Sequence, residues 1–183
     1  MPLPALKIAT AQGELQIKRA TTADFDVIYA MMVEAATWLR SRDISQWSFF
    51  FTEPSKDFVR NRIIGAETYL VFDPPERPVA TFTLYWKDEE IWGGRGLDGT
   101  AGYIHGLAVC RRAAGRGLGH ILLTTASNLI AQNSRRWARL DCMAQNEALC
   151  NYYRRAGFTD LGVADSNITG KPLRLFQRPI ASR

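Results

Sequence analysis

Three glycines occur within five residues, at Gly115, Gly117 and Gly119, where the segment LAVCRRAAGRGLGHILL (107–123) passes from an apolar run into a helix-like one. Glycine weakens a helix and raises the entropic cost of ordering the chain, so this position needs bare backbone for some purpose. A strand followed by a glycine-rich turn that opens a helix is typical of an anion-binding site, because the first N–H groups of a helix lack internal acceptors and its dipole favours negative charge. A tight turn in which glycine only relieves crowding is the structural alternative.

Two well-known phosphate-binding patterns do not fit this turn. The nucleoside-triphosphate loop ends in Gly-Lys-Ser/Thr, whereas Leu118 and Gly119 follow Gly117 here. The dinucleotide-binding pattern is G-x-G-x-x-G near the start of a domain, whereas this spacing is G-x-G-x-G and lies past the midpoint of the chain. The turn therefore predicts an anion site of another kind.

Length and composition indicate one globular domain. The chain has 183 residues, of which 46% are hydrophobic and 22% charged, enough for a substantial core. We expect an N-terminal tail at residues 1–13 and a single domain at 14–183. No apolar run approaches the ~20 residues that span a bilayer, and the first residues lack the apolar core of a signal peptide. These features predict a cytoplasmic protein without a membrane partner.

The cysteine spacing and the net charge limit the kinds of site and partner that we expect. Cys110, Cys142 and Cys150 are odd in number and lack the paired spacings of a zinc site, so we expect reduced, packed thiols and no metal. The formal net charge is +5, and the arginine-rich second half suits an anionic partner. A basic nucleic-acid-binding protein is one such class. The sequence shows neither a recognisable binding module nor a basic stripe interleaved with exposed aromatics, so we expect no nucleic-acid partner.

Hydrophobic periodicity predicts alternating strands and helices. Apolar residues at steps of three and four predict a one-sided helix after a Thr21 cap, and short alternating runs predict strands. The segment 92–102 is rich in glycine and is expected to be a loop. Mixed strands and helices predict an α/β or α+β sandwich of one sheet between helices. The expected strands are 14–20, 68–73, 78–87, 103–109, 137–144 and 173–178, and the expected helices are 21–42, 54–66, 118–132 and 146–158.

The glycine segment resembles the acetyl-CoA-binding motif of the GNAT superfamily of N-acetyltransferases. Gly117 and Gly119 take its two glycine positions, while Ala114 stands where the family usually has Arg or Gln. Further on, NEALCNYYRRAGF (146–158) resembles the second conserved helix of that family. The matching positions of this helix are Asn146, Leu149, Tyr153, Gly157 and Phe158.

This resemblance implies a GNAT fold, that is, a mixed, largely antiparallel central sheet flanked by helices, with a parallel split at the cofactor site. It implies transfer of an acetyl group from acetyl-CoA to an amine of a small-molecule or peptide acceptor, by direct attack in a ternary complex. A homodimer is a further expectation, because many proteins that it resembles form dimers. The residues implied in cofactor binding are Leu107, Ala108, Val109, Arg112, Ala114, Gly115, Arg116, Gly117, Leu118, Gly119, His120, Asn146 and Tyr153.

The family also implies catalytic roles for matched positions. Tyr153 would protonate the departing thiolate, although an aromatic core residue is the structural alternative. The N–H of Val109 would stabilise the developing oxyanion. The attacking amine must first lose a proton, which calls for a general base.

His105 is the candidate base in the strand before the turn. The period of two in a strand places it on the same face as Tyr103, Leu107 and Val109. Tyr103 stands where some histone-modifying members of the family carry a glutamate base, so we expect His105, or a water that it holds, to replace that glutamate. A structural histidine is the alternative, and Glu89, Glu90 and Asp98 remain further candidates.

The acceptor side is expected in the aromatic segment 38–51. Trp38 and Trp47, with Tyr103, are the predicted substrate-binding residues, and Asp43 or Glu53 could pair with an ammonium group. Ordinary core under a loop is the alternative for these aromatics.

A catalytically weak acetyl-CoA sensor is the alternative function, because Ala114 departs from the family pattern and the base is not fixed by the sequence.

Overall fold

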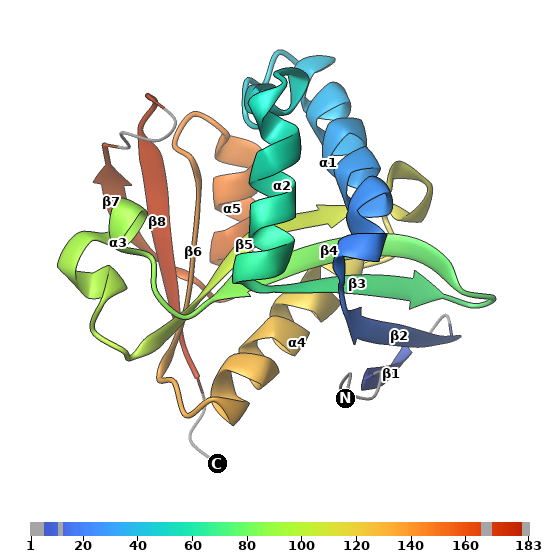
Figure 1. Ribbon diagram of the computed structural model, residues 1–183. Helices are drawn as coiled ribbons and strands as arrows, with labels where there is room; N and C mark the ends of the chain where they lie inside the picture. The colour runs from blue at the N-terminus through green and yellow to red at the C-terminus, as the bar shows by residue number, and fades with distance from the viewer. Residues whose placement is uncertain (1–5, 11–12, 166–169, 181–183) are drawn as a thin grey trace. The chain divides into compact units, whose positions relative to one another are not determined.

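The predicted alternation of strands and helices is present in the computed structural model, which describes residues 6–10, 13–165 and 170–180 (Figure 1). The strands follow the order β1-β2-β3-β4-β5-β6-β8-β7 in one sheet. The pairs β1–β2, β2–β3, β6–β8 and β7–β8 are antiparallel, and β5–β6 is parallel. This confirms the expected mixed, largely antiparallel sheet. The chain divides into two compact units, a first of residues up to Thr83 with Gly106–Gly119, and a second of Leu84–His105 with the residues from His120 onward.

The first unit contains the N-terminal strands and two helices. Its elements are β1 (Leu6–Thr10), β2 (Gly13–Arg19), α1 (Phe25–Arg40), α2 (Pro54–Gly65), β3 (Glu67–Asp73) and most of β4 (Arg77–Tyr85). Thr21 is the N-cap of a short 3-10 helix (Thr22–Asp24), where its N–H donates to the Asp24 carboxylate at 2.8 Å. The α-helix α1 itself begins at Phe25, four residues later than the predicted start. The helices α1 and α2 lie side by side (Figure 1) and bury apolar side chains such as Met32 and Ile63 with Leu70 of β3.

The second unit contains the remaining strands and helices. Its elements are α3 (Glu89–Trp92), the start of β5 (Ala101–Val109), α4 (Leu118–Gln132) from His120 on, β6 (Trp137–Met143), α5 (Glu147–Arg155), β7 (Thr159–Ala164) and β8 (Leu173–Pro179). Strand β8 holds both longer helices. Phe176 packs against Tyr153 of α5 with ring centroids 5.5 Å apart, and Arg178 donates to the Ser127 hydroxyl of α4 at 2.6 Å.

Three parts of the secondary structure differ from the sequence-based expectation. The predicted tail includes strand β1, which pairs with β2. The predicted loop at 92–102 includes the end of α3 and a 3-10 turn at Gly93–Gly96, and β5 begins at Ala101. Strand β7 was not predicted, because Gly162 with φ +95° and a register shift between Asp160 and Val163 interrupt its alternation. No helix among the described residues is long and apolar enough to cross a membrane.

Gly102 of β5 is a point of close packing in the second unit. A Cβ there would lie 2.5 Å from Ile130 Cγ1 and 3.0 Å from the Trp86 ring. We expect Gly102→Ala to lower the free energy of unfolding by about 1–3 kcal/mol through overpacking, measured by urea denaturation. Gly94→Ala is the matched control, because a Cβ at Gly94 meets nothing within 4 Å. Equal losses in the two variants would show that packing at Gly102 is not the cause.

Candidate active site

The glycine turn in the first unit has a backbone that favours glycine. Gly115 and Gly117 have φ angles of +79° and +72°, in the left-handed region. A Cβ at either position would meet nothing within 4 Å, so both glycines face open space. Leu118 then begins α4, and the first N–H groups of a helix have no acceptor within it. The turn thus presents bare backbone beside a helix N-terminus, where a phosphate group can approach closely.

The arginines around this turn make contacts within the first unit. Arg112 donates to the carbonyl of Pro78. Arg116 lies 3.0 Å from the carboxylate of Asp73, a nearly buried side chain. The guanidinium of Arg111 stacks 4.1 Å above the Trp38 ring. Ala114 lacks the side chain that the family usually has at this position. The arginines that would supply positive charge in its place already contact other protein groups.

The aromatic side chains of segment 38–51, where the acceptor was expected to bind, are divided between core and surface. Phe50 is buried, and the Trp47 ring meets its edge with centroids 5.9 Å apart. Phe49 and Phe51 are exposed. The core alternative therefore holds for Phe50 and the packing of Trp47, while Trp38 supports the Arg111 guanidinium. A cavity of about 260 Å³ lies beside this segment and is lined by Ala36, Arg40, Asp43, Ile44, Ser45, Gln46, Ser48 and Phe51.

Strand β5 does not keep the regular alternation that was assumed for His105, Leu107 and Val109. Gly106 has a φ of +55°, which interrupts the period of two between His105 and Leu107. A Cβ at Gly106 would lie 2.6 Å from Arg62 Nη1, the far end of a flexible side chain, so the backbone angle is the main reason for glycine there. The expectation of one shared face therefore does not apply across Gly106.

His105 lies in a cluster with two carboxylates of the second unit. Its Nε2 is 3.0 Å from Asp88 Oδ2, and its Nδ1 is 3.7 Å from Asp141 Oδ1. The three side chains are only 14%, 10% and 12% exposed. The edge of the ring also meets Tyr85, with centroids 5.3 Å apart.

Neither carboxylate was identified from the sequence. Glu89 and Glu90, the candidates named instead, are exposed on α3. Asp141 carried a usable signal, since it is a lone acidic residue in the otherwise apolar end of strand β6. Asp88 could not be identified in this way, because it lies just before the short helix α3, which the sequence did not predict.

Tyr103 belongs to a buried polar network. It is 1% exposed, and its hydroxyl donates to the Arg95 carbonyl at 2.7 Å and accepts from Arg139 at 3.0 Å. Arg139 also donates to the Asp98 carboxylate at 3.2 Å. Asp98 therefore pairs with Arg139 and is not in the His105 cluster. The Tyr103 hydroxyl thus holds the loop before β5 through the Arg95 carbonyl, whereas the sequence predicted that Tyr103 binds the substrate.

Asn146 and Tyr153, two of the five matched positions of the second motif, lie at the N-cap of α5 and within it. The Asn146 side chain caps the helix by accepting from the Leu149 N–H at 3.2 Å, and it is buried. Tyr153 is also buried, between Phe158 and Phe176. Burial raises the pKa of Tyr153 well above its ordinary value, and the Cys142 and Asp141 side chains raise it further. Its hydroxyl therefore keeps its proton at neutral pH.

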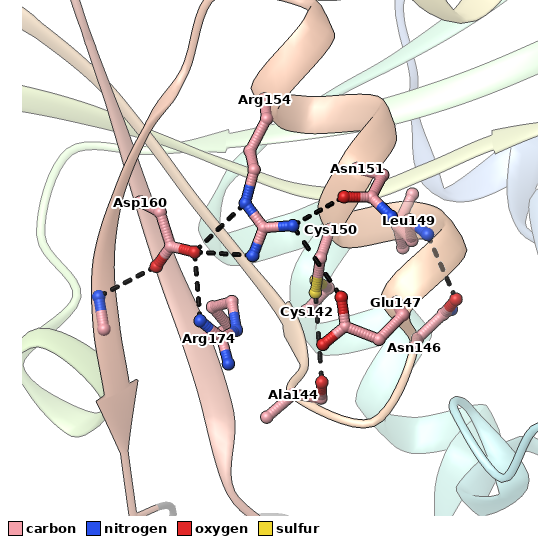
Figure 2. A network of polar contacts seen from close by, with 11 residues as sticks. Cys142, Ala144, Asn146, Glu147, Leu149, Cys150, Asn151, Arg154, Asp160 and Arg174 are labelled. Atoms are coloured by element: carbon pink, nitrogen blue, oxygen red, sulfur yellow. Dashed lines mark hydrogen bonds and ion pairs between the residues drawn. The ribbon is translucent and has the colours of Figure 1, made fainter.

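Polar contacts anchor the outer side of α5 (Figure 2). Arg154 and Arg174 both bind the Asp160 carboxylate, at 2.7 and 3.0 Å. Burial alone would raise the pKa of Asp160, but hydrogen bonds from these arginines and from the Gly162 N–H lower it. The helix that positions Tyr153 is thus tied to β7 and β8.

The thiols match the expectation of packed, free cysteines. All three are buried and unpaired in disulfides, and the Cys142 and Cys150 sulfurs are 3.6 Å apart. Burial raises the pKa of both Cys110 and Cys142. Neither thiol is therefore an activated nucleophile.

Comparison with known proteins gives a consistent result. Residues 38–158 match the acetyltransferase (GNAT) family. An uncharacterized N-acetyltransferase of Bacillus subtilis, YesJ, is 32% identical over 168 residues, which cover 89% of each chain.

Solved structures share the fold. A GNAT-family acetyltransferase from Listeria monocytogenes is 25% identical with a TM-score of 0.78, covering 95% of this chain and 99% of the other. The aminoglycoside acetyltransferase AAC(6')-Ib, solved with coenzyme A and kanamycin, is 16% identical with a TM-score of 0.69, covering 90% and 94%. The latter similarity concerns the fold alone.

Asp98 gives the network around Tyr103 an acid-sensitive contribution to stability. Burial alone would raise the pKa of Asp98, but hydrogen bonds from Thr100 and Arg139 hold it below its ordinary value of 3.8. Such a group stabilises the fold above its unfolded-state pKa, and this contribution is lost as pH falls through the folded-state value. We expect Asp98→Asn to be destabilised at neutral pH and to lose less further stability below about pH 4 than the wild type.

Urea unfolding at a series of pH values measures this difference. Asp57→Asn is the control, because Asp57 is an exposed carboxylate paired with Arg60 and leaves Asp98 in place. An Asp98→Asn protein with the full acid sensitivity of the wild type would contradict the assignment.

Proposed function

The chain belongs to the GNAT family of acetyltransferases, and on this premise we propose that it transfers the acetyl group of acetyl-CoA to the amine of a small-molecule acceptor by direct attack in a ternary complex. The observation that carries the proposal is the left-handed turn at Gly115 and Gly117, which leaves open backbone at the start of α4. A peptide amine is the variant acceptor. The relative solved with coenzyme A and kanamycin supports a coenzyme A ligand and shows that one protein of this fold takes a small-molecule amine.

The residues of the turn fit a pyrophosphate group. Large anions bind where several N–H groups converge without bulky side chains, and this turn has that composition. We assign pyrophosphate binding to the main chain from Gly115 to His120. The main-chain groups of Leu107, Ala108 and Val109 are proposed to hold the pantetheine arm as an added strand would.

The remaining cofactor contacts are proposed in the same way. Asn146 is assigned to the pantetheine, although its side chain already caps α5. Arg112 and Arg116 lie beside the turn and add positive potential there even while they contact Pro78 and Asp73. Ala114 supplies no charge, so recognition of the phosphates depends mainly on N–H groups.

In the proposed reaction the cofactor supplies the activated acetyl group, and protein groups stabilise the developing charge and transfer the protons. Acetyl-CoA supplies an activated acetyl thioester when it is bound. The Val109 N–H is the proposed donor to the thioester carbonyl oxygen. Tyr153 holds the proton that the departing sulfur requires, and its raised pKa keeps that proton in place at neutral pH. His105 is the proposed base for the attacking amine.

A screen of amines with acetyl-CoA tests the proposal directly. Free thiol release reports turnover, and isothermal titration reports binding of acetyl-CoA. Binding with turnover on at least one amine supports the enzyme, whereas binding without turnover on any amine supports the sensor alternative. Failure to bind acetyl-CoA would reject both, and steeply salt-dependent binding of DNA or RNA would then favour the nucleic-acid alternative.

The glycine turn is tested by Gly117→Ala. A left-handed alanine costs about 1–2 kcal/mol, and relaxation of the turn would move N–H groups away from the phosphates. We expect the Kd for acetyl-CoA to rise about tenfold or more, measured by isothermal titration. Gly162→Ala is the matched control, because Gly162 in β7 has a φ of +95° and equally open surroundings. An unchanged Kd in Gly117→Ala would remove the turn from the binding site.

The acid role is tested by Tyr153→Phe. This change removes one hydroxyl and keeps the ring between Phe158 and Phe176. We expect kcat to fall about 100-fold, with little change in the Kd for acetyl-CoA, because general acid catalysis contributes roughly 10²–10⁴-fold. Tyr152→Phe removes the neighbouring hydroxyl as a control and should keep its kcat. Equal activity of both variants would leave Tyr153 with a packing role only.

A further inference from the structure

We propose that Asp88 and Asp141 are positioning residues that make Nδ1 of His105 the atom that accepts the proton of the acceptor amine. Asp88 fixes the tautomer of the ring through Nε2, and Asp141 stabilises the imidazolium once Nδ1 is protonated. The arrangement of the three groups stands on geometry alone. Its catalytic meaning rests on the proposed acetyl transfer.

The two distances determine which nitrogen carries the proton in the neutral ring. Nε2 and Asp88 Oδ2 are 3.0 Å apart, which is a hydrogen-bond distance. Two lone pairs would repel each other at that distance, so Nε2 must be the N–H donor. Nδ1 and Asp141 Oδ1 are 3.7 Å apart, which is too long for a direct hydrogen bond. Nδ1 is therefore the unprotonated nitrogen of the neutral ring.

The backbone around Asp88 holds its carboxylate in place. The Asp88 N–H donates to the Gly96 carbonyl at 3.0 Å, and the Asp88 carbonyl accepts from the Trp92 N–H at 3.0 Å. A Cβ at Gly96 would lie 2.1 Å from the Asp88 carbonyl oxygen, so the loop closes tightly on this residue. Asp88 can therefore orient the imidazole, as the aspartate of a Ser-His-Asp triad orients its histidine.

The surroundings strengthen both carboxylate contacts. Three titratable groups contact the ring: Asp88 before α3, Asp141 of β6 and Tyr85 of β4. The three members of the cluster are at most 14% exposed, and charges interact more strongly where water is scarce. A proton on Nδ1 lowers the magnitude of the net charge of the cluster by one, because the ring becomes cationic between two anions.

The proton transfer balances without any other reactant. The N–H bond of the acceptor ammonium breaks, its electron pair stays on the nitrogen that attacks, and the proton forms a new bond to Nδ1. A water molecule can carry the proton where direct contact is too long. The proton then leaves to solvent, which restores the neutral ring for the next cycle.

Asp141 also acts on the proposed acid. Burial is the main cause of the raised pKa of Tyr153, and the Cys142 and Asp141 side chains add to it. One carboxylate of β6 therefore favours a proton on the Tyr153 hydroxyl and also faces the His105 ring.

A metal site is the competing interpretation of the same residues. One donor atom from each of Asp88, His105 and Asp141 lies within 4.8 Å of the others. A metal ion, however, needs its ligands to converge on one point. Here the imidazole lies between the carboxylates, and each of its nitrogens faces a different one. This arrangement fits a chain of hydrogen bonds better than a coordination sphere.

Nitrogen NMR of the imidazole rings tests the proposal independently of activity. The chain has 2 histidines, so ¹⁵N-histidine labelling gives two ring systems, and His120→Gln assigns them. We expect neutral His105 to carry its proton on Nε2. Asp88→Ala should move that proton to Nδ1, because Asp141 is then the remaining carboxylate that faces the ring.

Asp141→Asn should affect the ring differently from Asp88→Ala. The tautomer should stay unchanged, because the Asp88 contact at Nε2 remains, while kcat should fall, because the cationic ring loses its neighbouring anion. Glu90→Gln removes one negative charge from exposed α3 and should leave the ring signals unchanged.

Activity then separates the catalytic claim from the structural one. We expect kcat of Asp88→Ala to fall about 100-fold with little change in the KM for acetyl-CoA. A wild-type proton on Nδ1, or an unchanged tautomer in Asp88→Ala, overturns the proposal even if acetyl transfer is confirmed. Normal kcat in Asp88→Ala despite the tautomer change overturns the base role of Nδ1. Zn²⁺-dependent shifts of the ring signals, with activity lost to a chelator, would establish the metal site instead.

Discussion

The left-handed backbone at Gly115 and Gly117 is the constraint on which the proposed site depends. Nothing packs over either glycine, so close packing against a neighbour does not explain why a side chain is missing there. An exposed turn that keeps two glycines loses more conformational entropy on folding than one built from other residues. The left-handed turn itself favours glycine, and in the proposed function the phosphates of the cofactor approach this open backbone. The arginines nearby do not replace this function, because Arg112 and Arg116 already contact Pro78 and Asp73.

The parts of the fold that were predicted correctly have local causes. Helix α4 begins and ends at the predicted residues, because an apolar run follows directly after the glycines. The helical start near Thr21 was predicted from the residue type at that position, and the structure has a short 3-10 helix directly after it. Strands β1 and β7 were missed, since each is short and lies at an edge of the sheet order, where burial imposes little alternation.

The parts of the site that escaped prediction depend on tertiary contacts. His105 was identified from its place in β5, but its neighbours come from positions 17 residues before it and 36 residues after it. The parallel pairing of β5 with β6 and the short helix α3 bring these segments together. The face expected for His105 also relied on a regular strand, and Gly106 departs from that geometry. Motif positions can be read from the sequence, whereas the protonation of a side chain depends on charges that only folding places beside it.

In the proposed mechanism, two nearly buried carboxylates organise the acid–base chemistry of the second unit. An imidazole with one carboxylate partner has one fixed tautomer, and a second carboxylate at the opposite nitrogen stabilises the charged ring without competing for the same proton. The unequal distances of 3.0 and 3.7 Å are what make the two roles different, because only the shorter one requires a proton in the neutral state. In the proposed mechanism, Nε2 therefore orients the ring through Asp88, and Nδ1 is the nitrogen assigned to the proton transfer.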